Sequence, residues 1–239
     1  MTDIIRTGIT YVLVFFATLL ATPAFIVIGW IDPASPWMDR VARAWARSWL
    51  IGLGLRPQVE GTDRVDPDGS YVVVGNHQSN LDPMCHFLTF PAPLRFLAKK
   101  ELYSVPVFGS ALRATGMIKV DRDQPSMDFI NKQVDEAVAR GRSIIVYGEG
   151  TRSKTGEMAP FKKGPFVIAI QTGLPIVPVA INGTNAIWPP GAKMMHPGPV
   201  KIEFGEPIKT VGLTLADVDA LRDRTRTWIA ETLDRISNS

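Results

Sequence analysis

The chain has 239 residues, enough for one domain with a full hydrophobic core and a short appendage. Hydrophobic side chains make up 46% of it, which excludes a disordered or low-complexity protein. Its one cysteine, Cys85, excludes an internal disulfide framework and a thiolate-rich metal site. The formal net charge of +3 is too small to argue for nucleic acid, and no nucleic-acid partner is expected. This charge suits anionic lipids or phosphorylated substrates, although ordinary solubility accounts for it equally well.

The N-terminal part contains a long apolar stretch. From Gly8 to Ile31, 24 residues carry no charged side chain, and as one helix they would run roughly 36 Å, enough to cross a hydrocarbon core. Pro23 interrupts the stretch and leaves fifteen residues before it and eight after, neither of which spans alone. A kinked single span and an anchor in one leaflet therefore stay equally open. A cleaved signal peptide fits less well, because the stretch is too long and Asp3 lies where such peptides are basic.

A basic amphipathic helix is predicted over Trp37–Leu55. Helical projection separates an aromatic face from an arginine face, which is typical of a helix at a lipid interface. The alternative is a helix docked on the soluble core. Because arginines follow the apolar stretch and only Arg6 precedes it, the main body is expected on the cytoplasmic face of the cell membrane. Residues 1–55 are thus predicted to anchor the chain to the bilayer. The two faces consist of Trp37, Val41, Trp45 and Trp49 on one side, and Arg40, Arg43 and Arg47 on the other.

Residues 56–239 are predicted to form one α/β domain. Short apolar stretches of β type alternate with helical stretches, which implies a mostly parallel sheet flanked by helices. We find no internal repeat and no Gly/Ser linker that would divide this part. The strand candidates are Tyr71–Gly75, Met117–Val120, Ser143–Tyr147, Ile176–Ile181 and Val200–Phe204.

Two helices of this part carry clear signals. Ser126–Arg140 has Ser126 as a predicted N-cap. A last helix is expected to begin near Thr214, because Thr214 and Asp217 are spaced like a capping box. The apolar stripe predicted for the first of these helices consists of Phe129, Val134 and Val138.

Polar clusters directly follow three of the strand candidates. Asn76–Asp82 follows the first, Asp121–Arg122 the second and Gly148–Ser153 the third. If these strands run parallel, all three clusters meet at the carboxyl edge of one sheet, where open α/β folds place their sites. This convergence predicts a functional site at that edge.

The first cluster contains His77 and Asp82, five positions apart. On a continuous helix they would be about 140° apart, and Pro83 disfavours helical geometry at the residue before it. The sequence therefore predicts a turn, Asp82 as N-cap, and a helix over Pro83–Phe90. A turn can fold the carboxylate onto the imidazole. Asp82 would then fix the tautomer of His77 and stabilise the imidazolium once His77, as general base, takes a proton.

Plainer readings of the same residues stay open. Asp82 can be a helix cap only, and a lone loop histidine is more often structural than catalytic. A metal site of His77, Asp82 and His86 is disfavoured, because no fourth ligand or supporting acidic cluster is evident, and no metal is predicted.

Basic side chains near the clusters predict a cationic pocket. Arg122 and Arg152 lie in the second and third clusters, and Lys99 and Lys100 follow the β-like stretch Arg95–Ala98. Guanidinium groups match phosphate oxygens in two-point fashion. The plainer reading is a set of exposed ion pairs, each worth under about 1 kcal/mol.

The third cluster adds two residues to this pocket. Gly150 lets the backbone approach a ligand closely, since it has no side chain. Glu149 is expected to hold an arginine or a hydroxyl in place.

At these residues the sequence resembles the 1-acyl-glycerol-3-phosphate acyltransferases (lysophosphatidic acid acyltransferases) and their glycerolipid acyltransferase relatives. His77–Asp82 (HQSNLD) fits the family's H-x4-D catalytic motif. Lys119 departs from the pattern, since many relatives carry an apolar or aromatic residue there. The resemblance spans about residues 57–210. Its further blocks, in order, are Phe96–Leu102 (FLAKKEL), Gly116–Arg122 (GMIKVDR), Tyr147–Ser153 (YGEGTRS), Phe161–Ala169 (FKKGPFVIA), Leu174–Ile181 (LPIVPVAI) and Pro199–Ile208 (PVKIEFGEPI).

The resemblance implies an acyl transfer. His77 deprotonates the free hydroxyl of lysophosphatidic acid, which attacks the thioester of acyl-CoA or acyl-carrier protein and gives phosphatidic acid without a covalent acyl-enzyme. Asp82 orients His77, and the Pro178 block contributes to the acyl site. No cofactor or metal is expected, because a thioester already leaves well. The residues implied to bind the acceptor and its phosphate are Arg122, Glu149, Gly150, Thr151 and Arg152.

Other functions remain alternatives. A hydrolase would need Ser79 or Ser153 as nucleophile, and the sequence has no G-x-S-x-G elbow. A non-catalytic lipid-binding or transfer protein would keep its function without His77. Within the family, another lysolipid such as a lyso-aminolipid is the alternative acceptor.

Overall fold

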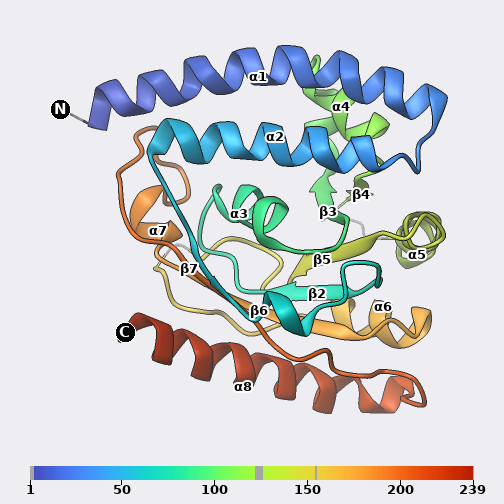
Figure 1. Ribbon diagram of the computed structural model, residues 1–239. Helices are drawn as coiled ribbons and strands as arrows, with labels where there is room; N and C mark the ends of the chain where they lie inside the picture. The colour runs from blue at the N-terminus through green and yellow to red at the C-terminus, as the bar shows by residue number, and fades with distance from the viewer. Residues whose placement is uncertain (1–2, 122–125, 154, 239) are drawn as a thin grey trace.

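The computed structural model describes residues 3–121, 126–153 and 155–238. Within them, seven strands form one sheet in the order β1-β7-β6-β2-β5-β3-β4 (Figure 1). Neighbouring strands run parallel except β6 and β7, which are antiparallel. The mostly parallel sheet is thereby confirmed. The strands are β1 Gln58–Glu60, β2 Val72–Gly75, β3 Leu94–Lys99, β4 Ile118–Val120, β5 Ser143–Tyr147, β6 Ile176–Asn182 and β7 Lys201–Phe204.

Helices cover both faces of this sheet (Figure 1). Residues of α1 to α4 share one hydrophobic cluster, and residues of α5, α6 and α8 share the other. Strand β2 contributes to both, since Val73 lies in the first cluster and Val72 and Val74 in the second. The helices are α1 Asp3–Ile31, α2 Pro36–Leu53, α3 Asp82–Thr89, α4 Phe108–Ala114, α5 Met127–Val138, α6 Gly164–Thr172, α7 Thr184–Ile187 and α8 Val218–Ser237, with 3-10 turns η1 Thr62–Arg64, η2 Lys100–Ser104 and η3 Leu215–Asp217.

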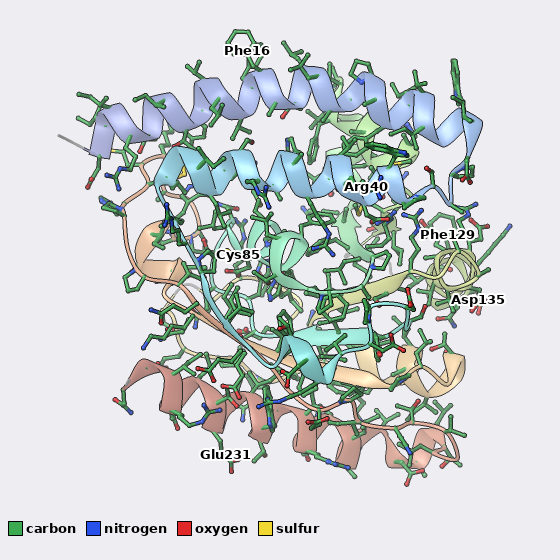
Figure 2. All side chains as sticks on the ribbon, viewed as in Figure 1. Phe16, Arg40, Cys85, Phe129, Asp135 and Glu231 are labelled. Carbon is green, nitrogen blue, oxygen red and sulfur yellow. The ribbon has the colours of Figure 1, made fainter. Side chains whose placement is uncertain are left out.

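The predicted cap of α5 is confirmed, and the predicted capping box near Thr214 is present but begins the 3-10 turn η3, after which α8 starts at Val218. Ser126 accepts from the backbone N–H of Phe129, and Thr214 and Asp217 form a capping box. The stripe predicted for α5 is wrong at one position, because the Phe129 side chain is 51% exposed (Figure 2). Ile130, Val134 and Ala137 form the buried face of that helix instead.

Helix α1 runs through Pro23 as one helix of 29 residues, so the interruption predicted there is wrong. Proline removes one backbone hydrogen bond, but the helix continues because residues on either side of Pro23 are packed against the rest of the protein. Ala21, Thr22 and Phe25 are all buried. By length and composition α1 is apolar enough to cross a membrane, and only 22% of its most apolar 18 residues are buried.

Helix α2 lies between α1 and α3 (Figure 1). Trp45 donates from Nε1 to the Thr18 hydroxyl of α1 at 2.9 Å. The Trp49 ring stacks on that of Trp188, with ring centroids 5.1 Å apart. The docked alternative is therefore the correct one for Trp45 and Trp49, whereas Trp37, at the start of the same face, is 59% exposed.

The arginine face of α2 is divided between two environments. Arg43 donates to the backbone carbonyls of Leu88, Phe90 and Pro91, which fastens α2 to the end of α3. Arg40 and Arg47 are exposed.

The outer surface of α1 is apolar along the whole helix. Phe16 points away from the rest of the molecule (Figure 2). The exposed large side chains of this helix include Ile4, Ile5, Ile9, Val12, Phe15, Phe16, Leu19, Leu20, Val27, Trp30 and Ile31.

Candidate active site

The structure brings His77 and Asp82 together. His77 Nδ1 and Asp82 Oδ2 are 2.7 Å apart, in the loop that joins β2 to α3. Asp82 is fully buried, and the His77 side chain is 11% exposed. Because a carboxylate only accepts, Nδ1 carries the hydrogen of this bond, and Nε2 is left as the basic nitrogen of the neutral ring.

The Asp82 carboxylate organises the loop rather than the helix. Its Oδ2 also accepts from the backbone N–H groups of Gln78 at 2.7 Å and Ser79 at 2.8 Å. Its Oδ1 accepts from the Thr184 hydroxyl at 2.6 Å. The prediction that Asp82 is the N-cap is therefore wrong: α3 begins at Asp82, after Leu81 as N-cap, and the carboxylate folds back onto the preceding turn.

The loops after β2 and β5 meet, as predicted for the carboxyl edge. Asp121 of the second cluster instead follows β4 at the end of the sheet, where it pairs with Lys100. The His77 backbone N–H donates to Glu149 Oε1 at 2.8 Å, and the Ser153 N–H donates to the His77 carbonyl. Glu149 Oε2 accepts from the Ala159 N–H, so this carboxylate holds backbone rather than the expected arginine or hydroxyl. Burial raises the pKa of Glu149.

Tyr147 forms one wall of the His77 site. Its ring stacks on the imidazole with centroids 3.8 Å apart and an angle of 7° between the planes. Its hydroxyl lies 3.2 Å from His86 Nδ1. Burial raises the pKa of Tyr147 well above its ordinary value, so the ring over His77 stays uncharged.

His86 is completely buried on α3, and burial lowers its pKa from 6.5 to about 4. The unfolded chain therefore binds a proton at this residue at a higher pH than the folded protein does. Stability linked to His86 is fully present above pH 6.5 and is lost as the pH falls toward 4. The loss amounts to roughly 3 kcal/mol.

We expect His86→Gln to reduce the acid sensitivity of folding. Glutamine keeps a hydrogen-bonding group near Tyr147 but does not titrate. The unfolding midpoint of the wild-type protein should fall more steeply than that of the variant between pH 6.5 and pH 4. Parallel curves for both proteins would contradict the assignment. Thermal scans across this range measure the difference.

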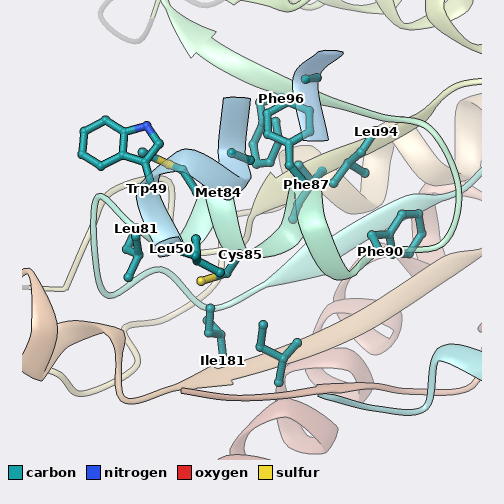
Figure 3. Packing of buried hydrophobic residues seen from close by; sticks show 14 of the residues in the cluster. Trp49, Leu50, Leu81, Met84, Cys85, Phe87, Phe90, Leu94, Phe96 and Ile181 are labelled. Atoms are coloured by element: carbon teal, nitrogen blue, oxygen red, sulfur yellow. The ribbon is translucent and has the colours of Figure 1, made fainter. Parts of the chain in front are cut away.

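A cavity of about 400 Å³ begins beside His77 and is lined mainly by apolar side chains. His77, Asn80 and Arg152 supply polar groups to its wall, and the Arg152 guanidinium donates to the Asn80 side-chain oxygen. The apolar wall comes from α1, α2, α3, β3 and α4. Phe87 of α3 lies beside Phe96 of β3, with ring centroids 4.6 Å apart (Figure 3). The sequence analysis did not predict that α1 and α4 form part of this wall, or that Asn80 lines the cavity and binds Arg152.

The other predicted binding residues lie in different environments. Lys99 lines the cavity together with Arg152, and its Nζ lies 3.5 Å from Glu101. Lys100 binds Asp121 at 2.7 Å. Thr151 is exposed, and Gly150 has a φ of +72°, which the turn after β5 requires. Arg122 lies outside the described residues.

Among the residues that the structure describes, no group of three or more His, Cys, Asp or Glu side chains is placed to hold a metal ion. Nδ1 of His86, which the sequence offered as a possible metal ligand, lies 3.2 Å from the Tyr147 hydroxyl.

Comparisons with known proteins agree with this arrangement. The family model described as Acyltransferase matches residues 56–182. A protein of Pseudomonas aeruginosa named 1-acyl-sn-glycerol-3-phosphate acyltransferase is 32% identical over 237 residues, which cover 94% of this chain and 91% of that protein. A protein of the same name from Saccharomyces cerevisiae is 33% identical over 202 residues, or 83% of this chain and 66% of that one.

A solved structure has the same fold. The crystal structure of the 1-acyl-sn-glycerophosphate (LPA) acyltransferase PlsC from Thermotoga maritima superimposes with a TM-score of 0.85, at 24% identity, over 99% of this chain and 97% of that one. The mixed sheet, the helices on both faces and the N-terminal helix pair are thus shared over nearly the whole length. With the sequence matches, this places the chain in the acyltransferase family, among the 1-acyl-sn-glycerol-3-phosphate acyltransferases.

Proposed function

We propose that this chain transfers a fatty acyl group from an acyl thioester to the free hydroxyl of lysophosphatidic acid and so forms phosphatidic acid. The observation that carries the proposal is the His77–Asp82 pair, whose imidazole lines a largely apolar cavity. The names of the relatives support the choice of acceptor. Acyl-CoA and acyl-carrier protein both fit as donors.

In the proposed reaction His77 is the general base. Nε2 takes the proton of the acceptor hydroxyl as its oxygen attacks the thioester carbonyl. The new C–O ester bond forms, the C–S bond breaks, and the leaving thiolate takes the proton back from the imidazolium. Asp82 stabilises the imidazolium in between. A positioned base of this kind is worth about 10²–10⁴ in rate, and no cofactor is needed because the thiolate is a good leaving group.

We assign the acceptor's phosphate to the basic groups beside His77. Arg152 and Lys99 line the same cavity as the imidazole, and a guanidinium binds phosphate through two parallel hydrogen bonds. Arg122 and Thr151 remain candidates for the same role. Glu149 supports the site indirectly, because it holds the backbone of His77.

A serine hydrolase that uses Ser79 is disfavoured by the hydrogen bond that the Ser79 hydroxyl donates. The Ser79 hydroxyl donates to the Trp188 carbonyl at 2.7 Å, and so its hydrogen is not directed at His77. The Ser153 hydroxyl accepts from the Gly156 N–H at 3.0 Å. Direct attack by the acceptor alcohol needs neither serine.

A panel of acceptors tests the function. Purified full-length protein receives acyl-CoA with lysophosphatidic acid, glycerol 3-phosphate, or a neutral or amino lysolipid, and free thiol is followed. We expect thiol release with lysophosphatidic acid and phosphatidic acid as product. If thiol is released only with an amino lysolipid, that lysolipid is the acceptor in place of lysophosphatidic acid. If no acceptor gives thiol release with either acyl-CoA or acyl-carrier protein, the proposed function is refuted.

We infer that the apolar cavity holds the acyl chain, and a substitution in its wall should therefore change the preferred chain length. Ala111 is a small buried residue of α4 on this wall. Ala111→Phe should lower kcat/KM for long-chain acyl donors by at least about tenfold relative to short-chain donors, since each excluded methylene loses about 0.8 kcal/mol. Ala44→Phe, on the exposed side of α2, is the matched control and should leave the ratio unchanged. Equal ratios in both variants would contradict the inference.

We infer that α1 binds one leaflet of the membrane rather than crossing it. Near its start, Thr7 exchanges hydrogen bonds with the backbone of Met195. Near its end, Gly29 lies against the backbone of Ala114. A helix held at both ends against the α/β part lies along the molecule, and its exposed apolar side is then available to the lipid. The arginines Arg40 and Arg47 of the neighbouring α2 favour an anionic, cytoplasmic surface.

Polar substitutions on the outer side of α1 should weaken membrane binding. We expect the double change Phe16→Asn and Leu20→Asn to reduce partition onto phosphatidylglycerol-containing vesicles at least about tenfold, because each side chain loses roughly 1.5–3 kcal/mol of apolar burial. Phe129→Asn alters an exposed aromatic residue on α5 and should not change partition. Sedimentation with vesicles measures both, and unchanged binding of the double variant would exclude this face.

A further inference from the structure

We propose that Thr184 is a positioning residue for the His77–Asp82 pair. Its hydroxyl donates to Asp82 Oδ1 at 2.6 Å, and both residues are fully buried. Thr184 lies 102 positions after Asp82, so this contact exists only because of the fold. The inference rests on the proposed function, since it assigns a residue to the same reaction.

The backbone delivers Thr184 to this place through a glycine. Strand β6 lies beside β2 and ends at Asn182, after which Gly183 has a φ of +92° and α7 begins. A Cβ atom at Gly183 would overlap the carbonyl oxygen of Pro199. Only glycine therefore fits both the conformation and the space, and the turn it makes puts the next side chain over the carboxylate.

The two oxygens of Asp82 have different partners. Oδ2 accepts from His77 Nδ1 and from two backbone N–H groups of the loop, whereas Oδ1 accepts from Thr184. Without the hydroxyl, a fully buried anionic oxygen loses a hydrogen bond, and the carboxylate gains by rotating toward another donor. Such a rotation withdraws Oδ2 from the imidazole. Thr184 thus fixes the orientation in which Asp82 steadies His77.

Two other bonds join the Thr184 segment to the same loop but do not reach the carboxylate. Asn185 Nδ2 donates to the Gln78 carbonyl at 3.1 Å, and the Ser79 hydroxyl donates to the Trp188 carbonyl. If Thr184 only connected this segment to the loop, the loss of any one of these bonds should change kcat by a similar factor. A positioning role singles out Thr184, and Asn185→Ala is therefore the matched control.

The test compares kcat and KM of four proteins with acyl-CoA and lysophosphatidic acid. We expect Thr184→Val to lower kcat about 10- to 100-fold, the scale of a hydrogen bond to a charged group, with KM within about twofold of wild type. Thr184→Ser keeps the hydroxyl and should recover most of kcat. Asn185→Ala should keep kcat within about threefold. Thermal unfolding verifies that each variant is folded.

Several results would overturn the inference. Equal losses of kcat in Thr184→Val and Asn185→Ala would leave Thr184 a structural residue only, as would a Thr184→Ser variant as slow as the valine variant. If Thr184→Val does not fold, Thr184→Ala takes its place, since alanine removes the hydroxyl without a methyl group against the carboxylate. An inactive wild-type protein would refute the proposed function instead, whereas an active wild type with an unimpaired Thr184→Val refutes only this role.

Discussion

Replacing His77 by alanine should reduce the rate of acyl transfer by about 10²–10⁴-fold, the contribution of a positioned general base. The substitution removes the nitrogen that accepts the acceptor proton, and it leaves the cavity wall open rather than blocked. We therefore expect kcat to fall while the protein still binds the acyl donor and the lysolipid. Thiol release from acyl-CoA measures the rate, and equilibrium binding of a radiolabelled acyl-CoA measures the affinity.

The chain offers a matched control for this substitution. His196 is an exposed histidine whose Nδ1 lies 2.7 Å from Asp3 Oδ2, so it is also paired with a carboxylate, but in a surface loop against α1. His196→Ala should retain the wild-type kcat. A folded His77→Ala protein that is as active as the His196→Ala protein would contradict the role of His77. If neither variant had activity above background, a non-catalytic lipid-binding protein would be favoured.

Asp82→Asn should cost at least about 10²-fold in kcat, although the side chain has nearly the same shape. The carboxylate accepts four hydrogen bonds from His77, Gln78, Ser79 and Thr184. An amide has one accepting oxygen, and its NH₂ group would face a donor on one side or the other. With the NH₂ group in the Oδ2 position, the amide faces the donors of His77, Gln78 and Ser79, and the bond that holds the tautomer of His77 is lost. With the amide oxygen there, that bond is kept, but the negative charge that stabilises the imidazolium is gone. Proton transfer therefore slows in either orientation, even where the fold is kept.

The control for Asp82→Asn is a carboxylate that is paired but exposed. Asp219 on α8 lies 2.9 Å from Lys163 and 2.8 Å from Arg222, and Asp219→Asn should leave kcat unchanged. The Asp82→Asn protein should also unfold at a lower temperature, because buried donors lose their partner. Retention of full activity in a folded Asp82→Asn protein would show that the carboxylate only shapes the loop.

Much of the fold could be predicted from the sequence because its signals are local. Five strand candidates coincide with β2, β4, β5, β6 and β7 to within one residue at either end. The alternation of strands and helices made a parallel sheet the natural arrangement, and polar residues after strands pointed to its carboxyl edge. The loops after β2 and β5 do meet there, since these strands are neighbours. Strand β1 was missed because its three residues at the sheet edge are too few for a pattern.

What the sequence could not provide depends on contacts between distant segments. The tryptophans of α2 have the spacing of a membrane-interface helix, and only the position of α1 over them turns Trp45 and Trp49 inward. Pro23 signals a helix break locally, but packing on α2 and the core keeps α1 continuous. The bond from Thr184 to Asp82 has no local signal beyond the Asn-Gly-Thr turn after β6.

Some of the predicted binding residues lie where local sequence signals placed them, whereas the partners of others depend on contacts between distant segments. Lys99, at the end of β3, and Arg152, in the loop after β5, both reach the cavity of His77, as the clustering of basic residues suggested. Glu149 lies beside His77 as predicted, but its partners differ from the expected ones, because its carboxylate accepts hydrogen bonds from the backbone N–H groups of His77 and Ala159. The identity of hydrogen-bond partners depends on a few ångströms of loop geometry, which spacing along the chain does not determine.

The central claim, that His77 activates the acceptor alcohol for direct attack on the thioester, is tested most directly by mixing the full-length protein with acyl-CoA in the absence of any acceptor. The account predicts no burst of free thiol and no acyl adduct on the protein by mass spectrometry, followed by thiol and phosphatidic acid in equal amounts once lysophosphatidic acid is added. A stoichiometric burst before the acceptor is present, with an acyl group on Ser79, Ser153 or another side chain, would contradict it.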